Sequence, residues 1–277
     1  MHLSPDDQAA LAELDARLKI LLPPAYADSY ESLSPAPMKS AGLKFDPNGQ
    51  VAWNEIWGSF CDLALAGGPP HKGALLGPAS AADVDAHPEL YDRVVREVCR
   101  GIEMVTSMPC EPGETPGWVH VECYSATMAA WLLRAIVTEN VAARATGVML
   151  DLPVAPSFRL EKEIKNIVTV SAKTSHYWLE HMPRAQQRAI AELLASLDRV
   201  SPLVTPMEPA TGWQGVECPD APAAIWMMRA LVAQNVLARR EAQTLLVPLN
   251  PTADPGGVRV RSAVARVQQL EGLRSQQ

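Results

Sequence analysis

The sequence predicts an α+β protein made of two tandem ferredoxin-like repeats, each with the element order βαββαβ. The main observation is an internal repeat: the motif Gly-Trp-x-x-Val-Glu-Cys at residues 117–123 returns at residues 212–218, so the offset is 212 − 117 = 95 residues. A second observation is that similar strand and helix patterns surround both copies. The open alternative is a three-layer α/β domain in which the first hairpin strand is only a loop.

The repeat continues without a gap as far as Pro153 in the first copy and Pro248 in the second. Further identities at this offset include Ala126, Trp131, Arg134, Ala135, Val137, Asn140, Val141 and Arg144, which return as Ala221, Trp226, Arg229, Ala230, Val232, Asn235, Val236 and Arg239. Such a series does not recur by composition alone. It predicts an internal duplication with two related half-sites, or one site on a pseudo-two-fold axis.

The bulk composition is that of a globular protein. The chain has 277 residues, 48% of them hydrophobic and 20% charged, which suits two modest domains. Its net charge of −7 argues against nucleic acid and against an anionic membrane surface, because both need a dense Lys and Arg footprint. The polar segment 1–15 predicts no secretory signal, and Arg134 within the most apolar helix argues against a membrane span.

The number and spacing of the cysteines indicate the cellular compartment in which the protein is expected. Cys61, Cys99, Cys110, Cys123 and Cys218 form no Cys-x-x-Cys pair. An odd, scattered set is typical of free thiols in a reducing environment. We therefore expect a cytoplasmic protein.

Four segments are predicted along the chain. Residues 1–57 form an N-terminal helix to about residue 22, a linker at 25–41 and a hairpin at 43–56 with an Asp-Pro-Asn-Gly turn. Repeat 1 (58–156) has a strand at 63–66, a helix at 83–104, a hairpin of 105–109 and 118–123, a helix at 125–145 and a strand at 148–152. Repeat 2 (157–253) has a strand at 167–172, a helix at 184–199, a hairpin at 201–218, a helix at 220–242 and a strand at 244–249. Residues 254–277 contain a last helix at 258–273.

Strand alternation separates the motif residues into two faces. Val119, Val121 and Cys123 should lie under the helices, with Cys218 in the same position of the second copy. We expect both cysteines to be core residues, since free Cys is among the most buried residue types. The alternative is a pair of thiols activated at helix N-termini, as in a two-thiol racemase.

Trp118, His120 and Glu122 share the opposite, open face, and Trp213 and Glu217 do so in the second copy. A carboxylate on a half-buried face needs a partner. Glu122 and Glu217 are therefore either salt-bridged to arginines or paired for acid–base work or metal ligation.

The helix after each Glu-Cys pair is apolar on two faces. One face of the first copy carries Trp131 with Arg134 alongside, and Trp226 with Arg229 repeats the pattern. Trp and Arg are typical interface anchors, so this second face should meet the other repeat, another subunit or the N-terminal arm. A homo-oligomer is one arrangement that would cover this second apolar face.

Two histidines, His71 and His176, follow the first predicted strand of each repeat. The loop 67–73 can offer backbone amides and Lys72 to an anion, although it fits no Walker or Rossmann fingerprint and glycine-proline loops are usually simple turns. The stretch 173–181 concentrates Lys, Thr, Ser, His, Tyr and Trp, and is the segment most expected to line a site. Its alternative is a surface loop with Trp178 as a plug.

The functional hypothesis is an enzyme that acts on a small polar or anionic metabolite at a composite site between the repeats. The predicted acid–base residues are His71, His176, Glu122 and Glu217, and the predicted substrate-binding residues are Trp118, Trp213, His120, Lys72, Tyr177 and Trp178. The alternative is a non-catalytic metal- or cofactor-binding assembly protein that oligomerises through the Trp/Arg helices. The sequence identifies no cofactor and no substrate.

Overall fold

The computed structural model describes residues 4–21, 43–55 and 74–275. They fall into two compact units. The central unit contains residues 43–55 and 75–182, and the terminal unit contains residues 4–21, 74 and 183–275. The predicted strand at 63–66, the loop at 67–73 and the linker at 25–41 lie outside the described residues. Helices and two antiparallel sheets make up the described chain, so the mixed α+β class is confirmed.

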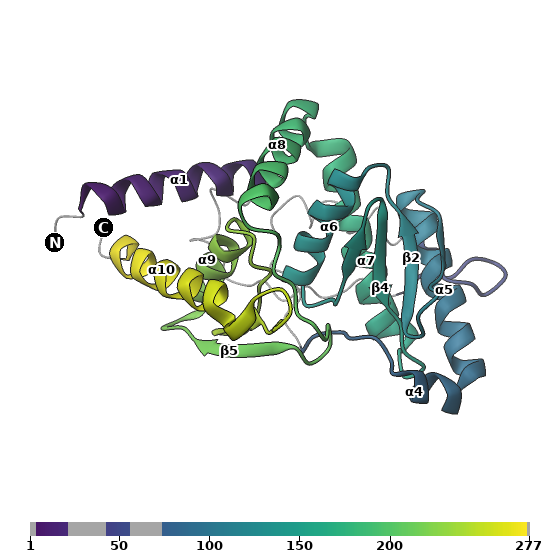
Figure 1. The fold of residues 1–277 in the computed structure, drawn as a ribbon. Coiled ribbons are helices and arrows are strands. Elements are labelled where there is room, and N and C mark those ends of the chain that lie inside the picture. Colours follow the sequence, from purple (N-terminus) through teal and green to yellow (C-terminus); the bar gives the residue numbers. More distant parts are fainter. Residues whose placement is uncertain (1–3, 22–42, 56–73, 276–277) are drawn as a thin grey trace. The chain divides into compact units, whose positions relative to one another are not determined.

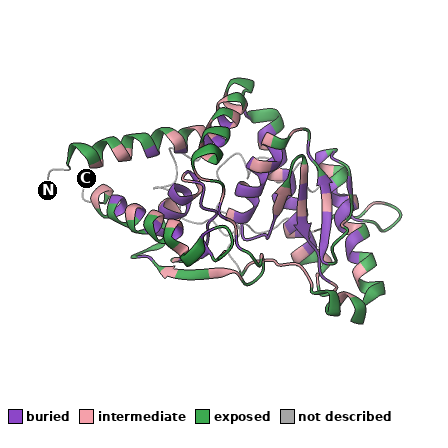
Figure 2. Ribbon diagram, in the orientation of Figure 1, coloured by how far each residue is buried: buried purple, intermediate pink, exposed green. Residues whose placement is uncertain are grey.

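The central unit is built on a four-stranded antiparallel sheet of order β1-β2-β4-β3. The strands are β1 (Cys110–Pro112), β2 (Trp118–Glu122), β3 (Arg144–Thr146) and β4 (Met149–Pro153), and the helices are α4 (Ala81–Ala86), α5 (Pro88–Thr106), α6 (Ala126–Thr138), η1 (Leu160–Ile164), α7 (Lys165–His176) and η2 (Tyr177–His181). Helices α5 and α6 pack against the strands, and α7 packs against these two helices (Figure 1). Helix α4 stays exposed, whereas the strand interiors are buried (Figure 2).

Local sequence explains where α4 and α5 begin and end. The Ser80 hydroxyl accepts from the Asp83 N–H, and the Ser80 N–H donates to the Asp83 carboxylate, which completes a capping box. Pro88 then starts α5, where a missing N–H has no cost. Ser107 ends α5 in a left-handed conformation with φ of 57°. The chain therefore turns sharply back from α5 into β1.

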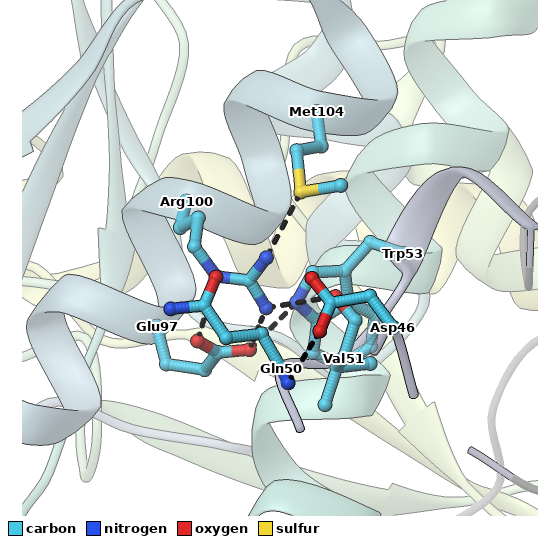
Figure 3. A network of polar contacts seen from close by, with 7 residues as sticks. All are labelled: Asp46, Gln50, Val51, Trp53, Glu97, Arg100 and Met104. Atoms are coloured by element: carbon cyan, nitrogen blue, oxygen red, sulfur yellow. Dashed lines mark hydrogen bonds and ion pairs between the residues drawn. The ribbon is translucent and has the colours of Figure 1, made fainter. Parts of the chain in front are cut away.

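A polar network attaches the N-terminal hairpin to α5 (Figure 3). Trp53 donates its Nε1–H to Glu97 over 2.8 Å, and Arg100 binds the same carboxylate through Nη2 at 2.6 Å. Arg100 Nη2 also donates to the Val51 carbonyl oxygen over 2.8 Å. The carboxylate of Glu97 raises the pKa of Arg100 through these hydrogen bonds. Trp53 is 1% exposed, so this network is a structural anchor.

The terminal unit has a three-stranded antiparallel sheet of order β5-β7-β6. Its elements are α1 (Pro5–Leu21), α8 (Arg184–Val200), β5 (Trp213–Glu217), α9 (Ala221–Val232), β6 (Arg239–Glu241), β7 (Thr244–Pro248), η3 (Pro255–Gly257) and α10 (Val258–Arg274). Helix α10 lies beside α9, and the Arg274 guanidinium sits 5.3 Å from the ring centroid of Trp226. Helix α1 contacts α8, and Asp7 accepts a hydrogen bond from Arg266 of α10 over 2.8 Å.

Within each sheet, equivalent residues of the two repeated segments pair in the same register. Trp118 pairs with Pro153 and Trp213 pairs with Pro248, so both pairs differ by 95 residues. Each helix that follows ends near an asparagine with positive φ, 60° at Asn140 and 62° at Asn235. Asparagine tolerates this left-handed conformation better than other non-glycine residues. Corresponding residues of the repeated segments thus adopt corresponding backbone positions within their own units.

Several sequence predictions need correction. The residues 167–172, predicted as a strand, lie in helix α7, which is buried almost all round against α5 and α6. A buried apolar run has no periodicity that separates strand from helix, and packing overrides the β preference of Val, Ile and Thr. Strands β3 and β6 replace the last turns of the helices predicted at 125–145 and 220–242. The ferredoxin-like order βαββαβ is not found in the described residues.

The predicted burial of the strand faces agrees with the structure in part, because Trp118, expected on the open face, is 3% exposed. Val119, Val121 and Cys123 are buried, and Cys218 is buried in the second sheet. Burial raises the pKa of the Cys123 thiol to about 12 and also raises the pKa of Cys218. Thiols that hold their protons this firmly are poor nucleophiles at neutral pH, so the two-thiol racemase has no support here.

Candidate functional site

A small pocket in the central unit is lined by three polar residues of the segment 173–181, namely Ser175, His176 and Glu180. Its volume is about 270 Å³, just below the range of roughly 300–1,000 Å³ that is typical of ligand sites. The last turn of α5 and its cap form one side, and the end of α7 with η2 forms the other. The lining residues are Val105, Thr106, Ser107, Tyr124, Ser175, His176, Leu179 and Glu180.

A π-helical turn shapes this pocket. Residues 177–181 form the π-helix η2, in which hydrogen bonds join residues five apart. His176 and His181 therefore come together, with their Nε2 atoms 3.0 Å apart and ring centroids 4.8 Å apart. In a regular α-helix two residues five apart would point about 140° away from each other. The imidazole pair exists because of the wider turn.

The pocket holds His176 in its neutral form. Burial lowers the pKa of His176, and the neighbouring His181 lowers it further, while the Glu180 carboxylate acts in the opposite direction. One imidazole donates a hydrogen from Nε2 and the other accepts, so the pair has room for one hydrogen between these two nitrogens. A second proton would place two positive rings in contact.

Other polar groups in the pocket can accept hydrogen bonds. The Ser175 hydroxyl is buried, its residue is 1% exposed, and no described residue bonds to it. The C-terminal end of α5 presents carbonyl oxygens and the negative end of a helix dipole. Tyr124 closes the edge by donating its hydroxyl to the Ser107 carbonyl oxygen over 3.2 Å.

A cluster of aromatic side chains packs against the turn that carries the histidine pair. Trp131 of α6 stacks on Tyr177 with ring centroids 6.1 Å apart, and it lies 5.4 Å from the ring of Trp178. Trp131 and Trp178 are buried. The second apolar face of α6 is therefore covered by α7 and η2 of the same unit. Tyr177 and Trp178, predicted to contact substrate, belong to the turn that carries the histidines and are not among the lining residues of this pocket.

A second polar cluster lies on the open face of the first sheet. His120 of β2 contacts Asp151 of β4 through Nδ1, and Asp151 accepts from Arg144 Nε over 2.6 Å. The guanidinium of Arg144 lies 4.4 Å from the ring centroid of Trp118. His120 Nε2 accepts the Glu114 N–H over 3.2 Å, so both ring nitrogens are engaged. This cluster fixes the β1–β2 hairpin and leaves His120 little capacity to bind a ligand.

The second sheet keeps only part of this cluster. Arg239 lies over Trp213 with 5.1 Å to the ring centroid, as Arg144 does over Trp118. Gly215 and Leu246 occupy the positions that correspond to His120 and Asp151. Trp213 donates its Nε1–H to the Pro209 carbonyl oxygen over 2.9 Å. The polar half of the open face is thus specific to the central unit.

The remaining predicted site residues are placed as follows. His71 and Lys72 lie outside the described residues. Glu122 and Glu217 are exposed at the ends of their strands, and Glu217 accepts a hydrogen bond from the Thr244 hydroxyl over 2.8 Å. The structure places Glu180 rather than Glu122 in the pocket with His176. Glu180, Ser175 and His181 were not singled out from the sequence, because their proximity depends on the π-helical turn.

No three His, Cys, Asp or Glu side chains in the described part of the chain are arranged to hold a metal ion. None of the helices in the described ranges combines the length and the apolar character needed to cross a membrane. Comparisons with protein family models, with curated proteins and with solved structures find no match for this chain. The function is therefore argued from the residues of the pocket.

Proposed function

We propose that the chain is an enzyme that acts on a small polar metabolite in the α5–η2 pocket, with His176 as the general base. The observation that carries this proposal is the convergence of three groups on one pocket: an imidazole of lowered pKa, the Glu180 carboxylate and the buried Ser175 hydroxyl. Titratable groups with shifted pKa values in a concave site are typical of catalytic residues.

The imidazole pair offers a route for the proton. When His176 takes up a proton from a bound substrate, its Nε2 contact with His181 offers a path along which a hydrogen can leave the ring. The hydrogen on Nε2 can then pass to His181, whose contact with His176 is exposed to solvent. His176 returns to its neutral form, which burial favours.

The electrostatics of the pocket favour a substrate with an amine, amide N–H or hydroxyl group. Glu180 and the carbonyl end of α5 accept hydrogen bonds and attract positive charge. An anionic substrate would need the predicted loop at 67–73 with Lys72, which the structure does not describe. We therefore propose a polar, hydrogen-bond-donating metabolite.

We also propose that the two sheets derive from an internal duplication. The equal spacing of strands, helices and registers supports this origin. The central copy retains polar side chains at His120 and Asp151 where the terminal copy has Gly215 and Leu246. We infer that chemistry specialised in the central copy.

Ligand-induced stabilisation tests the proposed site. Unfolding midpoints are measured with a panel of small amines, amides, polyols and carboxylates for the wild type, His176→Ala and Glu180→Gln. Matched controls are His87→Ala and Glu89→Gln, which change exposed residues of the same types. Donor-bearing compounds should stabilise the wild type and both controls but not the two pocket variants, because binding to the native state raises the midpoint. Stabilisation that survives in both pocket variants, or is confined to carboxylates, contradicts the proposal.

A second candidate function is metal binding, which the contact between the two histidines favours. Two imidazole nitrogens bound to one tetrahedral Zn²⁺ at about 2.1 Å lie about 3.4 Å apart, so the His176 and His181 Nε2 atoms, 3.0 Å apart, would separate by roughly 0.4 Å to hold the ion. A calorimetric Zn²⁺ titration tests it. One equivalent bound by the wild type and lost in His181→Ala supports metal binding, whereas equal binding by both proteins excludes this pair as the ligands.

A further inference from the structure

Two cysteines that are separated in sequence meet in the core of the central unit. Cys99 lies on α5 and Cys110 begins β1, and their Sγ atoms are 3.2 Å apart. Both residues are buried, at 8% and 7% exposure. Neither thiol belongs to the proposed active site, and the sequence contains no Cys-x-x-Cys motif that would have paired them.

The turn between α5 and β1 holds the two thiols in place. The Thr106 hydroxyl donates to the Ile102 carbonyl oxygen over 2.7 Å and accepts the Met108 N–H over 3.1 Å. The Cys110 N–H donates to the Glu103 carboxylate over 3.2 Å. These bonds tie the start of β1 to the last turns of α5, so the thiols stay in contact instead of meeting by chance.

We propose that Cys99 and Cys110 are a redox modification site and form a reversible intramolecular disulfide when a peroxide oxidant is present. A disulfide brings its sulfurs to about 2.05 Å, so each Sγ needs to move on the order of half an ångström. The segment that the bond closes includes Val105, Thr106 and Ser107, which line the pocket. The inference does not depend on the proposed enzymatic function, because it concerns the sulfurs alone.

Hydrogen peroxide is the oxidant used in the test, and the reaction balances. One cysteine, as its thiolate, attacks a peroxide oxygen. The O–O bond breaks, the departing hydroxide takes up the proton to become water, and a sulfenic acid remains. The second sulfur, having given up its proton, attacks that sulfur. The S–O bond breaks, the S–S bond forms and a second water leaves. The two thiols lose two electrons and the peroxide gains two.

The surroundings of the pair slow the reaction at neutral pH. The hydrogen bond that the Cys110 thiol donates to Cys99 and its burial hold the pKa of Cys110 far above the ordinary thiol value, and the carboxylates of Glu103 and Glu111 act in the same direction. Oxidation should therefore accelerate as the pH rises, because the thiolate is the reactive form.

The test maps the bond by mass spectrometry. Reduced full-length protein is treated with one equivalent of hydrogen peroxide, remaining thiols are alkylated, and the protein is digested with trypsin and a glutamate-specific protease. Cleavage after Arg100, Glu103, Glu114 and Glu122 separates Cys99, Cys110 and Cys123. We expect a mass loss of about 2 Da, a crosslink between the Cys99 and Cys110 peptides, and reversal by dithiothreitol.

Matched variants make the assignment specific. Cys123→Ser and Cys218→Ser should retain the crosslink, whereas Cys99→Ser and Cys110→Ser should lose it. If a serine variant does not fold, the peptide map of the wild type decides alone. A disulfide to Cys61, Cys123 or Cys218, or oxidation to separate sulfinic acids without a Cys99–Cys110 crosslink, overturns the proposal.

Discussion

His176 Nε2 lies 3.0 Å from His181 Nε2 at the end of α7, and this contact organises the pocket chemistry. The two imidazoles can hold one hydrogen between them but resist a second proton. Burial also disfavours the protonated form of His176 and so lowers its pKa. A histidine that stays neutral in a pocket is a suitable base near neutral pH.

Stability should depend on pH through His176. Its folded pKa lies below the unfolded value of about 6.5, so the unfolded chain binds the proton more tightly. The stability that the neutral ring contributes is complete above the unfolded pKa and is lost as the pH falls through the folded pKa. His176→Asn should flatten the difference in unfolding free energy between about pH 7.5 and about pH 5, measured with urea. His87→Asn is the control, and an unchanged slope in His176→Asn would contradict the lowered pKa.

Replacement of Asp151 by Asn should destabilise the central unit. Asp151 binds both His120 and Arg144, and its side chain is only 13% exposed. The loss of the charge weakens two hydrogen bonds at once, so the free energy of unfolding should fall by about 2 kcal/mol. Arg159→Ala breaks an ion pair whose arginine is 65% exposed, and should cost less than about 1 kcal/mol. Equal costs for the two variants would show that the open-face cluster is not an anchor.

Two glycines with positive φ should respond differently to substitution. Gly117 has φ of 86°, and an added Cβ would lie 2.4 Å from the Ala79 carbonyl oxygen. Gly147 has φ of 59° and nothing within 4 Å. Gly147→Ala should cost about 1 kcal/mol for the left-handed backbone alone. Gly117→Ala should cost more than about 3 kcal/mol, because the backbone of residue 79 must also move. Similar unfolding free energies for both variants would be inconsistent with this packing.

Asn235 allows the backbone and side-chain contributions to be separated. It has φ of 62°, and its amide donates to the Asp198 carboxylate over 2.6 Å and to the Ser201 carbonyl oxygen over 2.9 Å. Asn235→Gly keeps the backbone conformation but loses the amide, so it should cost about 2 kcal/mol. Asn235→Ala loses the amide hydrogen bonds and also disfavours the left-handed backbone, so it should cost about 1 kcal/mol more. Chemical denaturation measures the two values, and a less destabilising Ala variant would refute the role of the left-handed turn.

Strand faces could be predicted from the sequence, because side chains alternate in β2 and the buried Val119, Val121 and Cys123 follow that rule. The helix at 167–172 could not be predicted from the sequence, because burial on all sides removes the periodic pattern of apolar residues that marks a helix. Strands β3 and β6 were missed because Arg144–Thr146 and Arg239–Glu241 are short and lack apolar alternation.

The sequence favoured one segment that contributes residues to the candidate pocket. The segment 173–181 was expected to line a site, and His176 and Glu180 do line the pocket. The contact between His176 and His181 could not be predicted, because helical periodicity assumes turns of 3.6 residues and the chain forms a π-helix there. Cys99 and Cys110 were likewise missed, since the turn at Ser107 that joins them has no signature in cysteine spacing.

The most direct measurement is a pH titration of the histidine ring nitrogens by NMR, with His176 assigned from a His176→Gln variant. The general-base proposal requires a pKa for His176 below the ordinary value of about 6.5, and a shift of that pKa when a donor-bearing compound that stabilises the protein is added. A ring that titrates at the ordinary value and ignores every such compound would show that His176 is a surface histidine and that the pocket is not the active site.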